Sequence, residues 1–147
     1  RARILGAADA CENYHPTRPH PEGDGLSRAV SQAVQDAGVS FGEIGYICAH
    51  GSGTPQHAAI EVGVMNRLLQ KALTGHTMRS AAAVEAAACV LSIENQTLIP
   101  TWHLDNVLEP CSLDAVNGGP RNASLRCVIN NSAGFGGYNS SVVIAAA

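Results

Sequence analysis

The stretch from residue 44 to residue 55 reads Ile44-Gly45-Tyr46-Ile47-Cys48-Ala49-His50-Gly51-Ser52-Gly53-Thr54-Pro55. Its first half is a short apolar run, which predicts a buried strand. The second half contains glycines and closes with proline, which predicts that the strand ends abruptly. His50 therefore lies at the C-terminal end of a strand, where open α/β sheets place their ligand sites. Gly51 and Gly53 allow a sharp turn and the close approach of a ligand.

The chain on either side predicts alternating strands and helices. Strands are expected at residues 4–8, 125–130 and 141–144, and loops at residues 11–25, 95–123 and 131–139. Helices are expected at residues 26–37, 58–69 and 77–94. In the last of these, small and apolar residues indicate a deeply buried face formed by Ala81, Val84, Ala88 and Leu91. This order predicts an α/β fold whose sheet ends in antiparallel strands.

The composition limits the function. With 147 residues, 46 % of them hydrophobic and 14 % charged, the chain has the length of one domain and can form a core. A net charge of −3 and an aromatic content of 4 % argue against binding nucleic acid. No apolar run reaches about 18 residues, so no membrane contact is expected. Five cysteines without a CxxC pair are typical of reduced thiols in a cytoplasmic protein. Cys11, His15 and His20 lack the spacing of a zinc site, so no metal is expected.

Two further segments carry residues with chemical potential. The first reads Lys71-Ala72-Leu73-Thr74-Gly75-His76 and precedes the helix expected at 77–94. The positive end of the helix dipole and the charge of Lys71 both disfavour a protonated imidazole at His76. The second reads Asn131-Ser132-Ala133-Gly134-Phe135-Gly136-Gly137-Tyr138-Asn139. Its backbone N–H groups could face a developing oxyanion, although hairpin turns use glycine as well.

Together, these segments resemble the C-terminal half of β-ketoacyl-acyl-carrier-protein synthases, the thiolase-fold condensing enzymes of fatty acid and polyketide synthesis. The family motif HGTGTP corresponds to residues 50–55, KxxTGH to residues 71–76, and NSFGFGGTN to residues 131–139. The loop between Asp9 and Gly23 also resembles a family segment, so the resemblance covers essentially the whole chain. It implies an α/β, thiolase-like fold, C-terminal half, with a mixed sheet and helices on both faces.

The resemblance implies an acyltransferase that performs a decarboxylative Claisen condensation of malonyl-carrier protein with an enzyme-bound acyl group. In the family, two histidines donate hydrogen bonds to the malonyl thioester oxygen, and these correspond to His50 and His76 here. The family lysine, which is Lys71 here, forms an ion pair with a glutamate, and Glu61 occupies that position. These four residues are the expected catalytic residues.

The resemblance also assigns a substrate pocket. Ser52 and Thr54 match hydroxyls that contact the phosphopantetheine arm of the acyl carrier protein, and no other cofactor is expected. Residues of the last motif match the loop that shapes the pocket: Ala133, Gly134, Phe135, Gly136 and Gly137. Ala133 replaces the first phenylalanine of that motif, which predicts a wider passage for an unusual or bulky acyl chain.

The chain departs from the family pattern because no cysteine fits the nucleophile, which the family carries at a strand-to-helix elbow of its N-terminal half. Residues 1–147 are therefore expected to form a C-terminal ketosynthase half-domain, active only with an N-terminal half or partner chain that supplies the cysteine, and exposing a large apolar surface when alone. The acyl carrier protein and dimerisation of the assembled unit are also expected. An alternative is a non-catalytic subunit that shapes the acyl pocket, similar to a chain-length factor. The span from Glu61 to Lys71 is short for the family, either through a deletion or because residues are absent.

Overall fold

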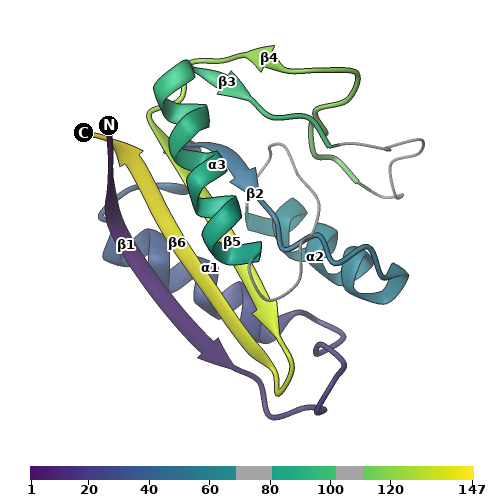
Figure 1. The fold of residues 1–147 in the computed structure, drawn as a ribbon. Helices are drawn as coiled ribbons and strands as arrows, with labels where there is room; N and C mark the ends of the chain where they lie inside the picture. The colour runs from purple at the N-terminus through teal and green to yellow at the C-terminus, as the bar shows by residue number, and fades with distance from the viewer. Residues whose placement is uncertain (69–80, 102–110) are drawn as a thin grey trace.

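The computed structural model describes residues 1–68, 81–101 and 111–147 (Figure 1). Its elements follow the alternation that the sequence predicts. In chain order they are β1 (Ala2–Cys11), α1 (Asp24–Asp36), the 3-10 helix η1 (Phe41–Glu43), β2 (Ile44–Cys48), α2 (Pro55–Leu68), α3 (Ala81–Asn95), β3 (Thr97–Leu98), β4 (Arg121–Asn122), β5 (Cys127–Gly134) and β6 (Tyr138–Ala146). The residues expected at the start of the third helix, 77–80, lie outside the described residues.

Four strands form one mixed sheet in the order β1-β6-β5-β2. β6 is antiparallel to both β1 and β5, whereas β2 is parallel to β5. β3 and β4 form a separate pair beyond the end of α3. The parallel pairing brings the carboxyl end of β2 beside Asn130 of β5, and this arrangement positions the His50 segment.

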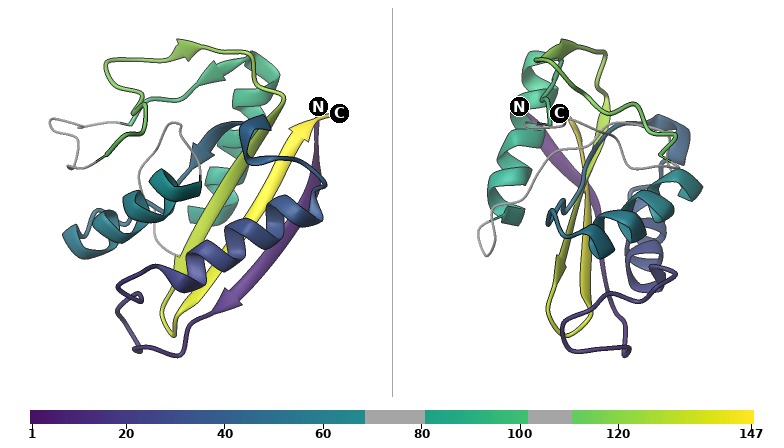
Figure 2. Two further views of the ribbon diagram at one scale, coloured as in Figure 1. Left: turned by 180° about the vertical axis from the view of Figure 1, so that it is seen from behind. Right: turned by 90° about the vertical axis from the view of Figure 1, so that its right-hand side faces the viewer.

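Helices cover both faces of the sheet, as predicted. Figure 2 shows α1 and α2 on one side and α3 on the other. Successive strand residues point to opposite faces, so Ile129 packs with α1 and α2 while Val128 packs with α3. Gly6 lets β1 and α1 approach closely, because a Cβ atom there would overlap the backbone of Ala33 and Ala37.

The hairpin between β5 and β6 is longer than predicted. Residues 131–134 were expected in a loop, but they continue β5, and only residues 135–137 connect the strands. The prediction relied on apolar runs, so it ended the strand where the polar residues Asn131 and Ser132 begin. In the structure, Asn131 and Ser141 are buried and bonded to each other, with Ser141 Oγ donating to Asn131 Oδ1 over 2.7 Å. Likewise, Cys11 was expected in a loop but ends β1.

The prediction for the buried face of α3 was wrong. Val84 and Leu91 are 55 % and 54 % exposed, whereas Glu85, Cys89, Ser92 and Ile93 face the sheet. The helix is apolar around most of its circumference, so periodicity alone cannot indicate which side is buried. The exposed side is instead an apolar surface without a described neighbour. The expected irregular region at 95–123 also contains two short strands, β3 and β4.

Candidate active site

His50 follows the end of β2 and is buried, with 8 % of its surface exposed. Its position is held by Glu61 of α2, which is also buried. The backbone N–H of His50 donates to Glu61 Oε1 over 2.6 Å, and that of Gly51 donates to Oε2 over 3.0 Å. Gly51 has a φ of 54°, a left-handed conformation that suits glycine. The glutamate thus fixes the turn that presents the histidine.

Burial raises the pKa of Glu61 from 4.5 to about 7. The two backbone N–H groups act in the opposite direction, because they stabilise the ionised carboxylate. The desolvation cost exceeds this stabilisation, so the ionised form of Glu61 is less stable in the folded chain than it would be in water. A site that carries such a cost commonly has a functional reason for the charge.

Glu85 is a site residue that the sequence analysis missed. It lies on the sheet side of α3, is 5 % exposed, and accepts no hydrogen bond of good geometry from the described residues. The pKa of Glu85 is raised to about 7, because burial and the charge of Glu61 raise it by more than the hydroxyl of Ser132 on β5 lowers it. The two carboxylates therefore lie close enough to interact. The available signal was a single charged residue within the apolar run Ala81–Val90.

The predicted hydroxyl pair is brought together beside the histidine. Ser52 Oγ and Thr54 Oγ1 lie 3.2 Å apart, and Thr54 is exposed. The carbonyl of Thr54 accepts the N–H of Ala58 over 2.9 Å, which begins α2. This placement leaves two hydroxyl groups accessible at the end of β2, where they can bond to a polar chain.

The predicted pocket loop is the tip of the β5–β6 hairpin. Phe135 is 83 % exposed, and Ala133 and Gly134 pair with β6. The tip contacts the loop that follows β1: Gly136 N donates to Pro16 O over 2.7 Å, and Glu12 N donates to Gly137 O over 2.9 Å. The position of Phe135 thus depends on a second loop.

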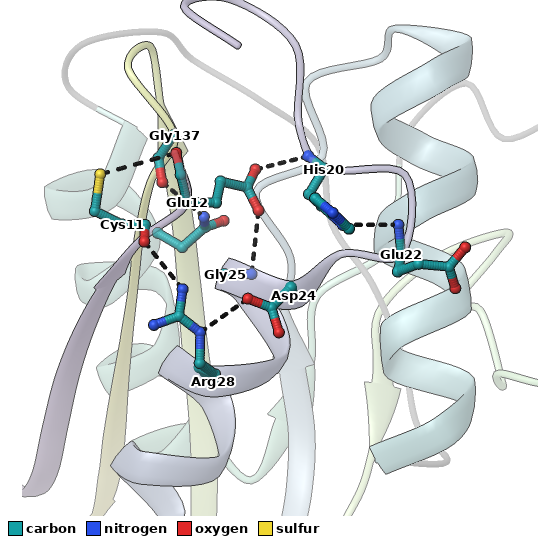
Figure 3. A network of polar contacts seen from close by, with 9 residues as sticks. Cys11, Glu12, His20, Glu22, Asp24, Gly25, Arg28 and Gly137 are labelled. Carbon is teal, nitrogen blue, oxygen red and sulfur yellow. Dashed lines mark hydrogen bonds and ion pairs between the residues drawn. The ribbon is translucent and has the colours of Figure 1, made fainter. Parts of the chain in front are cut away.

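Glu12, the first residue after β1, makes several of the hydrogen bonds that hold this second loop. Its buried carboxylate accepts the N–H of His20 over 2.8 Å and that of Gly25 over 3.1 Å (Figure 3). Gly137 has a φ of 79°, and a Cβ atom there would overlap the carbonyl oxygen of Glu12. Nearby, Arg28 bridges Asp24 and the carbonyl of Cys11. Glu12 therefore connects three segments: its carboxylate binds the loop and the start of α1, and its backbone N–H binds the hairpin tip.

The remaining predicted catalytic residues, Lys71 and His76, lie outside the described residues. The ion pair between Lys71 and Glu61 and the convergence of two histidines stay predictions. In the part of the chain that the structure describes, no group of three metal-binding side chains occurs. Nor does any helix there have the length and hydrophobicity needed to cross a membrane.

The cysteines offer little nucleophilic reactivity where they are buried. A hydrogen bond with Cys48, together with burial, raises the pKa of Cys89, and burial raises the pKa of Cys127. The thiolate is the reactive form, so a raised pKa makes these thiols poor nucleophiles. Cys11 is exposed at the end of β1, and Cys111 is half-buried.

Comparisons with known proteins agree with the motifs. Residues 1–105 match the family model described as beta-ketoacyl synthase, C-terminal domain. The 3-oxoacyl-[acyl-carrier-protein] synthase 2 of Coxiella burnetii is 34 % identical over 97 % of this chain and 37 % of its own length. A structure of the ishigamide ketosynthase/chain length factor superposes with a TM-score of 0.92 at 33 % identity, covering 99 % of this chain and 38 % of that chain.

A second similar structure is a complex of two proteins. It is a type II polyketide acyl-carrier protein in complex with its ketosynthase bound to the hexaketide, and it superposes with a TM-score of 0.90 at 26 % identity, covering 99 % of this chain and 38 % of that chain. The present chain therefore spans little more than a third of the length of the relatives that it matches.

Proposed function

We propose that this chain, which belongs to the beta-ketoacyl synthase C-terminal domain family, forms the C-terminal half of a condensing enzyme. The reaction is the decarboxylative condensation of malonyl-carrier protein with an enzyme-bound acyl group, in fatty acid or polyketide synthesis. The observation that carries the proposal is His50, buried at the end of β2 with its backbone held by Glu61.

In this mechanism, the bond between the malonyl methylene and its carboxylate breaks, carbon dioxide leaves, and the electron pair forms a thioester enolate. His50 donates a hydrogen bond to the thioester oxygen as its negative charge grows, and His76 supplies the second donor. The enolate then attacks the acyl thioester carbon, and the cysteine thiolate leaves. A preorganised donor of this kind contributes about 3 kcal/mol to the transition state. Glu61 supplies the preorganisation, because it fixes the backbone that carries His50.

Lys71 acts as the cation for the carboxylates in this proposal. Glu61 and Glu85 are both buried, and each has a pKa raised to about 7. A neighbouring ammonium group would favour ionisation of both. In this proposal Lys71 forms an ion pair with Glu61. Ser52 and Thr54 bind the phosphopantetheine arm, and the hairpin tip from Ala133 to Gly137 borders the acyl chain.

The nucleophilic cysteine belongs to an N-terminal half or partner chain. Support comes from the exposed apolar side of α3, where Val84 and Leu91 are each more than half exposed. A helix that is apolar all round is normally enclosed on every side. The greater length of the relatives leaves room for such a half. The acyl carrier protein is the transient partner, and the assembled unit dimerises. All five described cysteines are free thiols, which suits an enzyme of the cytoplasm.

A second candidate is a non-catalytic subunit that shapes the acyl pocket. One similar structure is described as a ketosynthase/chain length factor, and Ala133 replaces a bulky residue of the family motif. The test measures carbon dioxide release and β-ketoacyl product formation by the assembled complex with His50→Ala and with His76→Ala. The condensing role predicts that each variant loses activity by about 100-fold or more. Full activity in both variants would leave only the pocket-shaping role.

A further inference from the structure

Two residues of α2 face the His50 segment together. His57 and Glu61 are separated by one helical turn, so their side chains lie on the same side of the helix. Glu61 binds the backbone N–H groups of His50 and Gly51. The ring of His57 packs against the ring of His50, with 5.2 Å between ring centroids and an angle of 74° between their planes. One side of α2 therefore contacts both the backbone and the imidazole of the same histidine.

These two contacts restrict different motions of His50. The hydrogen bonds to Glu61 fix the backbone but do not act on the imidazole ring. The second side-chain torsion of histidine has a broad energy profile, so the backbone alone does not set the direction of the ring nitrogens. An edge-to-face contact between rings is a preferred geometry that restricts ring rotation. His57 supplies this contact from the first turn of α2, a well-anchored position close to Thr54.

We propose that His57 is a positioning residue, which orients the imidazole of His50 toward the malonyl thioester oxygen. The inference rests on the proposed condensing function, because it acts through the catalytic role of His50. A ring that samples several orientations spends less time aimed at the oxygen, so losing His57 lowers the rate of the chemical step. Substrate affinity stays unchanged, since the phosphopantetheine hydroxyls Ser52 and Thr54 lie elsewhere on the turn.

The experiment compares three variants in the assembled synthase: His57→Ala, His57→Phe, which keeps a ring, and Gln56→Ala as the matched control. Gln56 is the preceding residue of the same turn and is exposed. Carbon dioxide release from malonyl-carrier protein gives kcat and KM separately, and thermal unfolding reports the fold. We expect kcat of His57→Ala to fall about three- to tenfold, the range of an aromatic pair, with KM unchanged. His57→Phe recovers most of the rate, and Gln56→Ala matches the unmodified enzyme.

Two results would overturn the inference. The first is an unchanged kcat in His57→Ala, and the second is an equal loss in His57→Ala and His57→Phe, because a phenyl ring preserves the packing. If His57→Ala does not fold, His57→Leu replaces it in the comparison with His57→Phe. His50→Ala separates this inference from the proposed function. An active His50→Ala enzyme refutes the condensing role, whereas an inactive one beside a fully active His57→Ala enzyme refutes only the positioning role.

Discussion

The substitution Glu61→Gln tests whether burial raises the pKa of the Glu61 carboxylate. Burial raises the pKa of Glu61 from 4.5 to about 7, so the folded chain holds this proton more tightly than the unfolded chain does. The resulting stability is fully present below pH 4.5 and is lost as the pH rises through about 7. A rise from 4.5 to about 7 corresponds to about 3 kcal/mol at pH 8. Glutamine is neutral at every pH, so Glu61→Gln removes this contribution to the pH dependence of the free energy of unfolding.

The assay is urea unfolding of the assembled enzyme at pH 5, 6, 7 and 8. In a Lys71→Ala background, which removes the proposed neighbouring cation, the enzyme loses stability across this range. Adding Glu61→Gln reduces that loss by about 2.5 kcal/mol between pH 5 and pH 8. Glu22→Gln is the matched control, because it makes the same substitution at an exposed glutamate. A stability that is flat or rises with pH in the Lys71→Ala enzyme, or a pH dependence of stability that Glu61→Gln does not alter there, would contradict the effect of burial on Glu61. Activity falls in Glu61→Gln at every pH, since the amide NH₂ cannot accept a backbone N–H.

Three other substitutions test the loops and the interface. Gly137→Ala forces a Cβ atom onto the carbonyl of Glu12 and costs at least about 1–2 kcal/mol from its positive φ, measured by urea unfolding; equal stability would contradict the described contact. Ala133→Phe narrows the acyl passage and lowers kcat/KM for the native acyl substrate, and unchanged kinetics would count against a widened pocket. Leu91→Asp places a charge on the exposed apolar side of α3 and prevents assembly with the N-terminal half, as measured by size-exclusion chromatography. The control Arg18→Asp, on an exposed loop, assembles normally. If the Leu91→Asp chain also assembles, α3 is not part of the interface.

The position of His50 could be predicted because its signals are local. An apolar run followed by glycine and proline specifies a strand that ends at a sharp turn, and the structure has β2 ending at Cys48. The mixed sheet with helices on both faces was also correctly predicted, from the resemblance to the thiolase-fold condensing enzymes. In contrast, the bond between Glu61 and the backbone of His50 depends on how α2 packs, which no local pattern encodes.

Two errors have a common cause, which is that burial was inferred from apolar character. α3 is apolar on most sides, so its buried side is defined by the sheet beneath it and by the polar residue Glu85, not by its small residues. β5 continues through the polar residue Asn131, because its side chain finds a hydrogen-bond partner, Ser141, inside the fold. Glu85 was overlooked for the same reason, since a charged residue in an apolar helix is informative only when its surroundings are known.

The most direct test of the account is the single-turnover rate of carbon dioxide release from malonyl-carrier protein by the assembled enzyme with His50→Ala. We expect a rate about 100-fold or more below that of the unmodified enzyme, because one preorganised donor to the enolate oxygen is missing. The Glu22→Gln enzyme serves as the reference for an exposed substitution. A His50→Ala enzyme that releases carbon dioxide at the unmodified rate would contradict the account.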